Sequence, residues 1–229
     1  MTQVKLYRKD GACSFAPHAL LRHLSIPFQD VPMRAGEYGY EAADGSFTHA
    51  EYLSINPTGY VPALAVENEI VTEMPAVLTM ICHLAPDWER GLKLLGETPL
   101  EKATVIQWLA WLSGTLHSLG FGGYWRPNRF VEDNVECYGV VKEKAMKVIK
   151  AGFGRIDERL KGKTYALGDK PTVVDFNLYF FWRWGYEVGI PMEKEYHNFE
   201  RALRQVEKLE GIRQAVEEEG LGRYFEPQH

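Results

Sequence analysis

Residues 4–31 read VKLYRKDGACSFAPHALLRHLSIPFQDV, and this stretch places one helical pattern between two strand patterns. Val4 to Tyr7 and Phe28 to Val31 are short runs rich in residues that strands favour. Phe15 to Leu24 carries apolar residues at helical spacing. The order predicts a β-α-β unit at the start of the chain.

The next fifty residues continue the alternation. A Gly-rich loop from Gly36 to Gly45 precedes a short helix around Ala50 to Leu53. Ala63 to Val66 and Ile70 to Thr72 are separated by Glu-Asn-Glu, which predicts a hairpin. Met74 to Leu84 then has helical apolar spacing. Residues 1–85 are therefore expected to form a mixed α/β domain of order βαβ, then ββα.

Everything beyond a turn-rich linker at 86–97 is expected to be helical, so we predict an all-α bundle domain over 98–229. Thr98-Pro-Leu-Glu101 and Thr172-Val-Val-Asp175 have the residue pattern of helix caps. The expected helices run from Thr98 to about Leu119, Val135 to Leu160, Phe176 to Trp184, Asn198 to Val206 and Gly211 to Glu218. The third of these is apolar nearly all round and should be buried.

The composition of the chain argues against nucleic-acid binding, a disulfide framework, a metal site and a membrane span. The chain has 229 residues, 26 Lys plus Arg and 31 Asp plus Glu, for a net charge of −5. No basic run offers a surface for nucleic acid. Three cysteines fit neither a disulfide framework nor a metal site, and the N-terminus lacks the apolar core of a secretory signal, so we expect a cytoplasmic protein without metal. The uncharged stretch Ala103 to Trp125 contains polar residues, which favours a buried helix over a membrane span.

Cys13 and Ser14 lie where the first strand gives way to the first helix. Unpaired N–H groups and the helix dipole stabilise an anion at such a position, so the pKa of Cys13 could be lowered, or a bound thiolate could be held there. Both interpretations predict a sulfur site. In the alternative, Ser14 only caps the helix and Cys13 only packs.

Pro62 stands at the entrance to a predicted strand, and Val61-Pro62 is our candidate for a cis peptide bond. A cis bond would leave the main chain of Val61 free to pair with an extended peptide ligand. The alternative is a trans proline that begins an edge strand. Glu73, at the start of the next helix, could cap that helix or receive a ligand ammonium group.

Six motifs together resemble cytosolic glutathione S-transferases, and the bacterial beta class is the most similar. They are Lys5-Leu-Tyr-Arg-Lys-Asp-Gly-Ala-Cys-Ser14, Asn56-Pro-Thr-Gly-Tyr-Val-Pro-Ala-Leu64, Thr72-Glu73, Trp108-Leu-Ala-Trp-Leu-Ser-Gly-Thr-Leu-His117, Thr172-Val-Val-Asp175 and Arg183-Trp184. The resemblance covers nearly the whole chain. It implies a thioredoxin-like domain over 1–85 with the glutathione site, and an all-helical domain over 98–229 that carries the electrophile pocket.

The same resemblance assigns catalytic roles. Cys13 corresponds to the beta-class cysteine beside the glutathione sulfur, and His117 to the histidine that faces the thiol. Ser14 is the better candidate for an activating hydroxyl, because related classes keep their catalytic residue near this position. Tyr7 matches the catalytic tyrosine of other classes poorly.

Binding residues follow from the matched motifs. Val61, with Tyr60 and Pro62, would pair with the cysteinyl backbone of glutathione, and Glu73 would bind the γ-glutamyl ammonium. Met74 could offer only its main-chain N–H to the γ-glutamyl carboxylate. Arg34 would lie near the glycine end. The expected electrophile pocket is lined by Tyr7, Phe15, Tyr124, Trp125 and Trp184, although aromatic residues on helices more often form core.

We therefore predict a glutathione transferase that conjugates the glutathione thiolate to small apolar electrophiles, a detoxification activity, without nucleic acid, membrane or metal. One alternative is a glutathione thiol transferase or reductase that depends on Cys13. Another is a non-catalytic binding protein on the same scaffold. A homodimer is expected because Met80, Trp108 and Trp111 add apolar surface beyond what one subunit needs.

Overall fold

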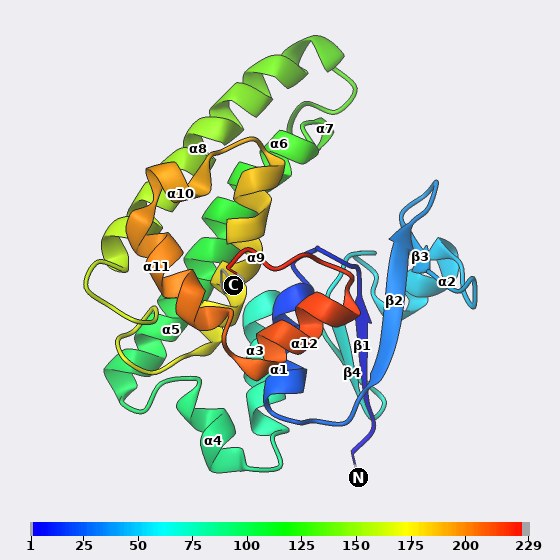
Figure 1. Ribbon diagram of the computed structural model, residues 1–229. Helices are drawn as coiled ribbons and strands as arrows, with labels where there is room; N and C mark the ends of the chain where they lie inside the picture. Colours follow the sequence, from blue (N-terminus) through cyan, green and yellow to red (C-terminus); the bar gives the residue numbers. More distant parts are fainter. Residues whose placement is uncertain (1, 226–229) are drawn as a thin grey trace.

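A computed structural model describes residues 2–225, with a mixed sheet in the first third of the chain and helices in the rest (Figure 1). The strands are β1 (Val4–Arg8), β2 (Gln29–Ala35), β3 (Tyr40–Ala42), β4 (Ala63–Val66) and β5 (Glu69–Val71). Their order in the sheet is β3-β2-β1-β4-β5. β1 and β2 run parallel, and the other neighbouring pairs are antiparallel, so the expected β-α-β unit followed by a hairpin is present.

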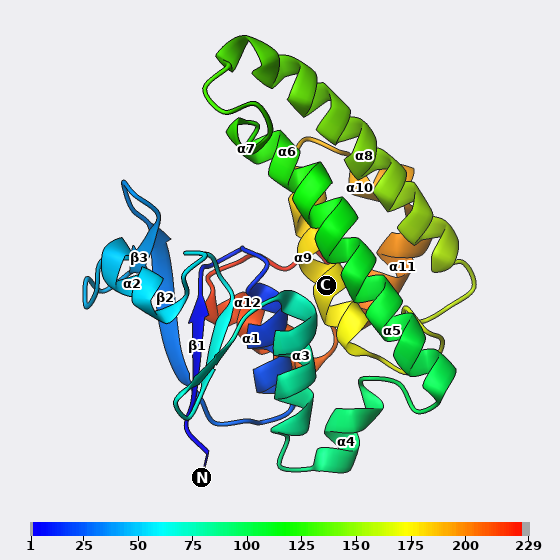
Figure 2. The ribbon, with the colours of Figure 1, turned by 180° about the vertical axis from the view of Figure 1, so that it is seen from behind.

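The two faces of the sheet are covered by different helices. Leu6 and Leu64 are fully buried in the core that includes α1 (Phe15–His23) and α3 (Met74–His83). Tyr7, one residue further along β1, packs on the opposite face against α2 (His49–Ile55). This alternation is the period of two that a strand imposes on its side chains. Figure 2 shows α1 and α3 on the side of the sheet that faces the later helices.

The expected loop from Gly36 to Gly45 is wrong in part, because the chain forms a β-hairpin there. β2 continues through Pro32 to Ala35 and pairs with β3, with Met33 opposite Ala42. Pro32 can lie in β2 because its register partner Arg8 is the last residue of β1, where the parallel ladder ends. The linker at 86–97 likewise contains a helix, α4 (Trp88–Lys93), whose N-cap Asp87 accepts from the N–H of Arg90.

The second half of the chain is helical, as expected. A continuous helical rod consists of α5 (Pro99–Trp111), a π-helical stretch (Leu112–Phe121) and α6 (Gly122–Trp125). It is followed by α7 (Asn128–Val131), a 3-10 turn (Val135–Cys137), α8 (Tyr138–Arg159), α9 (Val173–Glu187), α10 (Met192–Glu195), α11 (His197–Val206) and α12 (Glu210–Glu218). In the part of the chain that the structure describes, no helix is long and apolar enough to cross a membrane.

α9 is the centre of the helical half, with every residue from Val173 to Gly185 buried. It contacts α1, α5 and α11. α12 packs directly on α1, as Figure 1 shows. A side chain at Gly211 would collide with the Ala19 carbonyl and with His23, so only glycine permits this close approach.

Trp108 and Trp111, which suggested surplus apolar surface, both pack against arginine side chains of the same chain. Trp108 is fully buried, and the Arg159 guanidinium lies 3.8 Å from its ring centroid. Trp111 is half-buried, with the Arg155 guanidinium 4.6 Å from its ring centroid. These two tryptophans therefore do not support a homodimer.

Asp175 connects the start of α9 to the preceding loop, and its loss should destabilise the fold. Its buried carboxylate accepts from the N–H groups of Ala166 (2.7 Å) and Thr172 (2.8 Å) and from the Thr172 hydroxyl (3.1 Å). Asp175→Ala leaves these donors without acceptors and should cost about 3 kcal/mol of unfolding free energy. Thermal melting should then occur roughly 6–12 °C lower.

Glu101 supplies a matched control because it closes the same capping box with Thr98 at the solvent-accessible start of α5. Glu101→Ala should cost only about 1 kcal/mol. Equal losses of melting temperature in the two variants would contradict the special role of burial at Asp175.

Candidate active site

A cavity of about 680 Å³ lies between the two halves of the chain and is lined by both. The first half contributes the loop that ends at Cys13, the segment around Val61 and the start of α3. The second half contributes the π-helix, α6 and the face of α9 that contains Trp184. Of the predicted site residues, those lining it are Cys13, Tyr60, Val61, Pro62, Glu73, Met74, His117, Trp125 and Trp184.

Cys13 lies at the start of α1, where its buried thiol donates to the Val61 carbonyl at 3.4 Å. Burial raises the pKa of Cys13 to about 12, although nearby main-chain N–H groups and the Arg126 charge act in the opposite direction. The expectation of a lowered Cys13 pKa is therefore wrong. Desolvation of a thiolate at this buried position outweighs the helix N-terminus.

Ser14 must be withdrawn as the activating hydroxyl. Its side chain is fully buried and does not line the cavity. The hydroxyl accepts from the Lys9 N–H at 3.0 Å and donates to the Lys9 carbonyl at 3.2 Å. The Ser14 side chain also caps no N–H of α1. Both of its hydrogen bonds are to Lys9, so they stabilise the loop between β1 and α1.

The Val61-Pro62 peptide bond is cis, as predicted. The segment before it is held by side chains, because the Tyr60 carbonyl accepts from the Tyr52 hydroxyl at 2.8 Å and from the Asn56 amide at 2.7 Å. The Val61 N–H has no acceptor among residues 2–225, and its carbonyl receives the Cys13 thiol. This main chain thus faces the cavity with an N–H that is open to a ligand.

Glu73 and Met74 mark the start of α3 at the cavity wall. Glu73 is exposed and makes no side-chain cap, and its φ of 66° is unusual for a residue other than glycine. Such backbone strain persists at sites where the surrounding structure fixes it. Met74 is buried in the core, so only its main chain is suited to polar contact with a ligand.

His117 lies on the π-helix and faces the aromatic wall of the cavity. Its ring centroid is 5.3 Å from that of Trp184 and 6.4 Å from that of Phe181. Burial, assisted by the charges of Arg126 and Arg129, lowers the pKa of His117 to about 4. The imidazole is therefore neutral at pH 7 and can donate one N–H, but it accepts a proton reluctantly.

Arg126 and Arg129 were missed by the sequence analysis, although both line the cavity. Their guanidinium carbons lie 5.4 and 4.5 Å from the ring centroid of Tyr60, and Arg126 also donates to the Tyr40 hydroxyl at 3.2 Å. Neither forms a salt bridge with a carboxylate among residues 2–225. The signal available in the sequence was two arginines three residues apart directly after the pocket candidate Trp125.

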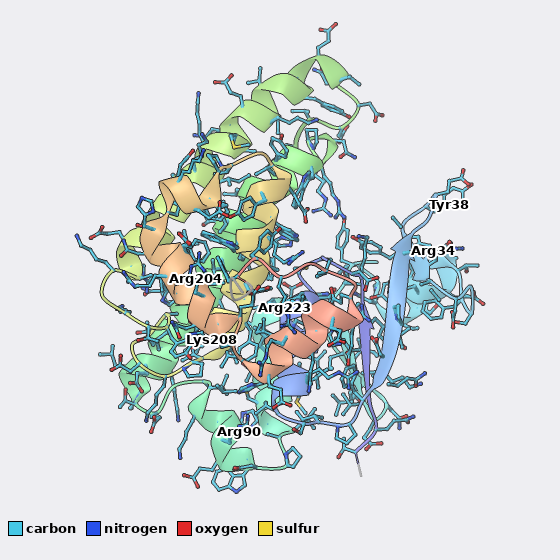
Figure 3. The ribbon with its side chains drawn as sticks, viewed as in Figure 1. Arg34, Tyr38, Arg90, Arg204, Lys208 and Arg223 are labelled. Atoms are coloured by element: carbon cyan, nitrogen blue, oxygen red, sulfur yellow. The ribbon has the colours of Figure 1, made fainter. Side chains whose placement is uncertain are left out.

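Arg34 does not reach the cavity. It lies on the β2–β3 hairpin, of which Ala35 and Tyr40 line the cavity but Arg34 does not; Figure 3 shows Arg34 at the outer edge of the sheet. Its guanidinium pairs with Glu41 at 2.9 Å across the hairpin. The prediction that Arg34 lies near the glycine end of a ligand is therefore wrong. Residues 36–45 were expected to form a loop, but β3 pairs with β2 there and places Glu41 beside Arg34.

Three predicted pocket residues pack elsewhere. Tyr7 faces Phe47 and Tyr52 on the other side of the sheet. Phe15 is fully buried and stacks on Tyr179, and Tyr124 packs against the same core. Their places in the wall are taken by three aromatic residues that the sequence analysis did not select: Phe121, Phe180 and Phe181.

The part of the chain that the structure describes holds no group of three or more His, Cys, Asp or Glu side chains that could bind a metal ion. The site therefore offers a thiol, a neutral imidazole, two arginines, one lysine (Lys9), the two carboxylates of Glu73 and Glu187, and an aromatic wall.

Comparison with known proteins finds the same family over the helical half and over nearly the whole chain. Residues 139–210 match the family model "Glutathione S-transferase, C-terminal domain". The glutathione S-transferase GstA of Escherichia coli O157:H7 is 29% identical over 219 residues, which cover 95% of this chain and 100% of that protein. A bacterial beta class glutathione S-transferase of Sphingomonas chungbukensis is 29% identical with a TM-score of 0.78, covering 95% of this chain and 100% of that one.

Over nearly its whole length, the chain is similar to bacterial glutathione S-transferases. A further solved structure, a sphingomonad glutathione S-transferase complexed with glutathione, is 27% identical with a TM-score of 0.78, and the match covers 95% of this chain and 100% of that one. The resemblance derived from the sequence motifs is thus confirmed, including its direction toward the bacterial beta class.

The pKa of Cys13 leads to a prediction about alkylation. At pH 7.5 iodoacetamide should modify the half-buried Cys137 and leave Cys13 and Cys82 unmodified, since burial raises the pKa of both to about 12. Because only the thiolate reacts, the Cys13 rate should rise about tenfold per pH unit between pH 7 and 10. Peptide mass mapping measures all three sites. Modification of Cys13 as fast as Cys137 at pH 7.5 would show that Cys13 is a thiolate.

Proposed function

We propose that this protein is a glutathione transferase that conjugates the glutathione thiolate to small apolar electrophiles. The observation that carries the proposal is one cavity with an unpaired main-chain N–H on one side and an aromatic wall on the other. Val61 and Glu73 belong to the side with the N–H, and Phe181 and Trp184 to the wall. Relatives named as glutathione S-transferases, one of them complexed with glutathione, support the same reading.

Glutathione is proposed to bind along Val61 as an added strand, with its cysteinyl carbonyl accepting from the Val61 N–H. Glu73 would then receive the γ-glutamyl ammonium, and the Met74 N–H, at the start of α3, the γ-glutamyl carboxylate. An extended tripeptide places its two ends on opposite sides of Val61. The glycine carboxylate would therefore lie toward Tyr60, where Arg126 and Arg129 stand without carboxylate partners.

Activation of the glutathione thiol is proposed to depend on the positive potential of the cavity. Arg126 acts to lower the pKa of both Cys13 and His117, which means that it favours negative charge at their positions. A ligand thiol between them experiences the same field and loses its proton to solvent more easily. The neutral His117 N–H and the Cys13 S–H can both donate to the resulting thiolate.

The chemical step follows from a thiolate held beside an apolar wall. The sulfur electron pair forms a carbon–sulfur bond with the electrophile, and the pair of the broken bond leaves with a halide, with an epoxide oxygen or as an enolate. The alternative in which Cys13 itself forms a mixed disulfide is less well supported. A thiol with a pKa of about 12 is a poor nucleophile at neutral pH.

Turnover tests the proposal directly. The protein with glutathione should conjugate at least one member of a panel of aryl halides, epoxides and enones, measured by mass spectrometry of the thioether product. Glutathione binding without any turnover would favour the non-catalytic binding protein. An adduct of one glutathione on the isolated protein that disappears in Cys13→Ala would favour the thiol transferase.

The arginine pair gives a prediction about the glycine end of glutathione. Arg126→Ala combined with Arg129→Ala should raise the KM for glutathione by roughly 10–100-fold, because charge-assisted hydrogen bonds contribute about 1.5–3 kcal/mol. Glutathione blocked as its glycyl ethyl ester should bind the wild-type protein and the double variant equally weakly. Steady-state kinetics with both peptides measures this.

Arg34→Ala is the matched control, since this arginine is paired with Glu41 outside the cavity. It should leave the KM for glutathione unchanged. A rise with Arg34→Ala, or a double variant that still prefers glutathione over its ester, would place the carboxylate elsewhere.

We further propose that the protein acts in the cytoplasm as a homodimer and serves in detoxification. Free cysteines suit a reducing compartment. Support for the dimer comes from an exposed apolar stripe at helical spacing on α5: Ala103, Ile106 and Ala110. Ile106→Glu should convert a particle of twice the chain mass into a monomer in light scattering. A wild-type protein that scatters as a monomer at micromolar concentration would refute the dimer.

A further inference from the structure

The face of α9 that lines the cavity is aromatic except at one end. Phe180, Phe181 and Trp184 recur at helical spacing and form the wall, and Asn177 precedes them by one turn on the same face. All four line the cavity. The stripe therefore ends in a carboxamide at a position where an apolar side chain would continue the wall.

Asn177 is 1% exposed, and its Oδ1 has no hydrogen-bond donor among residues 2–225. Three other buried side-chain atoms in this range also lack partners: His23 Nδ1, Trp182 Nε1 and Tyr186 Oη. None of their residues lines the cavity. Buried polar groups are nearly always hydrogen-bonded, so an unpartnered acceptor at a cavity wall is open to a donor from a ligand.

The position of Asn177 relative to Cys13 suits contact with a molecule that also reaches the sulfur. Trp184 donates to the Gly11 carbonyl at 2.9 Å, and Tyr179 stacks on Phe15 at 5.2 Å between ring centroids. Cys13 lies between Gly11 and Phe15 in the sequence, and Cys13, Trp184 and Asn177 line the same cavity. Asn177 is seven residues from Trp184 on the same face of α9, about 10 Å along the axis.

The aromatic residues beside Asn177 indicate which kind of ligand could donate to its Oδ1. The aromatic wall selects a flat apolar body. The free Oδ1 requires an O–H or N–H on that body, and a hydroxyl on an aromatic ring provides a donor in the ring plane without adding a charge that the dry wall would reject. An aromatic ether of the same size has an oxygen but no hydrogen to donate.

We propose that the aromatic part of the cavity binds hydroxylated aromatic molecules, with the hydroxyl donating to Asn177 Oδ1. That such molecules serve as the second substrate rests on the proposed glutathione transferase function. Their binding does not depend on it, so binding and conjugation can fail separately.

Three naphthalenes that differ in one substituent test the hydrogen bond by calorimetric titration. 2-Naphthol has a donor, 2-methoxynaphthalene has only an acceptor, and 2-methylnaphthalene has neither. The wild-type protein should bind 2-naphthol about tenfold more tightly than either of the others. Asn177→Leu should bind all three with equal affinity, and its melting temperature should be unchanged or higher because the replaced group had no partner.

Ser113→Ala is the control, because Ser113 also lines the cavity with a polar side chain but is only half-buried. It should keep the preference for 2-naphthol. Equal binding of the three ligands by the wild-type protein, tight binding of the ether, a preference that survives in Asn177→Leu, or no binding at all would each overturn the proposal. Glutathione titration and turnover on the same preparation report separately on the transferase function.

Discussion

The Gly11 peptide is the junction on which the cavity depends, because both of its polar groups are bound by the distant C-terminal half. The Trp184 indole N–H donates to the Gly11 carbonyl at 2.9 Å, and the Gly11 N–H donates to Glu219 at 2.8 Å. Gly11 itself has a φ of 68°, which favours glycine. Two residues later comes Cys13, so these two bonds set the distance between the thiol and the aromatic wall.

A buried network of charges makes this junction stiff. The side chain of Glu219 is fully buried and also binds His18 Nδ1 at 2.8 Å, and Arg8 lies 3.9 Å away. Arg8 in turn pairs with Asp30 at 2.7 Å. Removing one member of such a network leaves an uncompensated buried charge, which costs roughly 3–5 kcal/mol. The C-terminal segment is therefore part of the active-site scaffold, although it contributes no residue to the cavity wall.

What the sequence could predict depends on how local each interaction is. The β-α-β unit, the cis Val61-Pro62 bond and the capped start of α9 are specified by adjacent residues, and the structure contains them. Ser14 and Arg34 were assigned to the ligand because their partners come from turns that the sequence did not reveal. Arg126 and Arg129 were missed because their position over Tyr60 arises only when the two halves meet.

The perturbed pKa values of Cys13 and His117 fit the proposed function, in which the ligand supplies the anion. A wall dry enough to raise the pKa of Cys13 to about 12 and to lower that of His117 to about 4 keeps both groups neutral. The fixed charges nearest to them are arginines, which are always protonated. A thiol site with neutral donors and arginines as its nearest charges gains most from a negative charge that enters with its own binding contacts. A ligand thiolate anchored by its two carboxylates meets that condition, whereas a thiolate of the protein at the buried Cys13 would lose its solvation without such compensation.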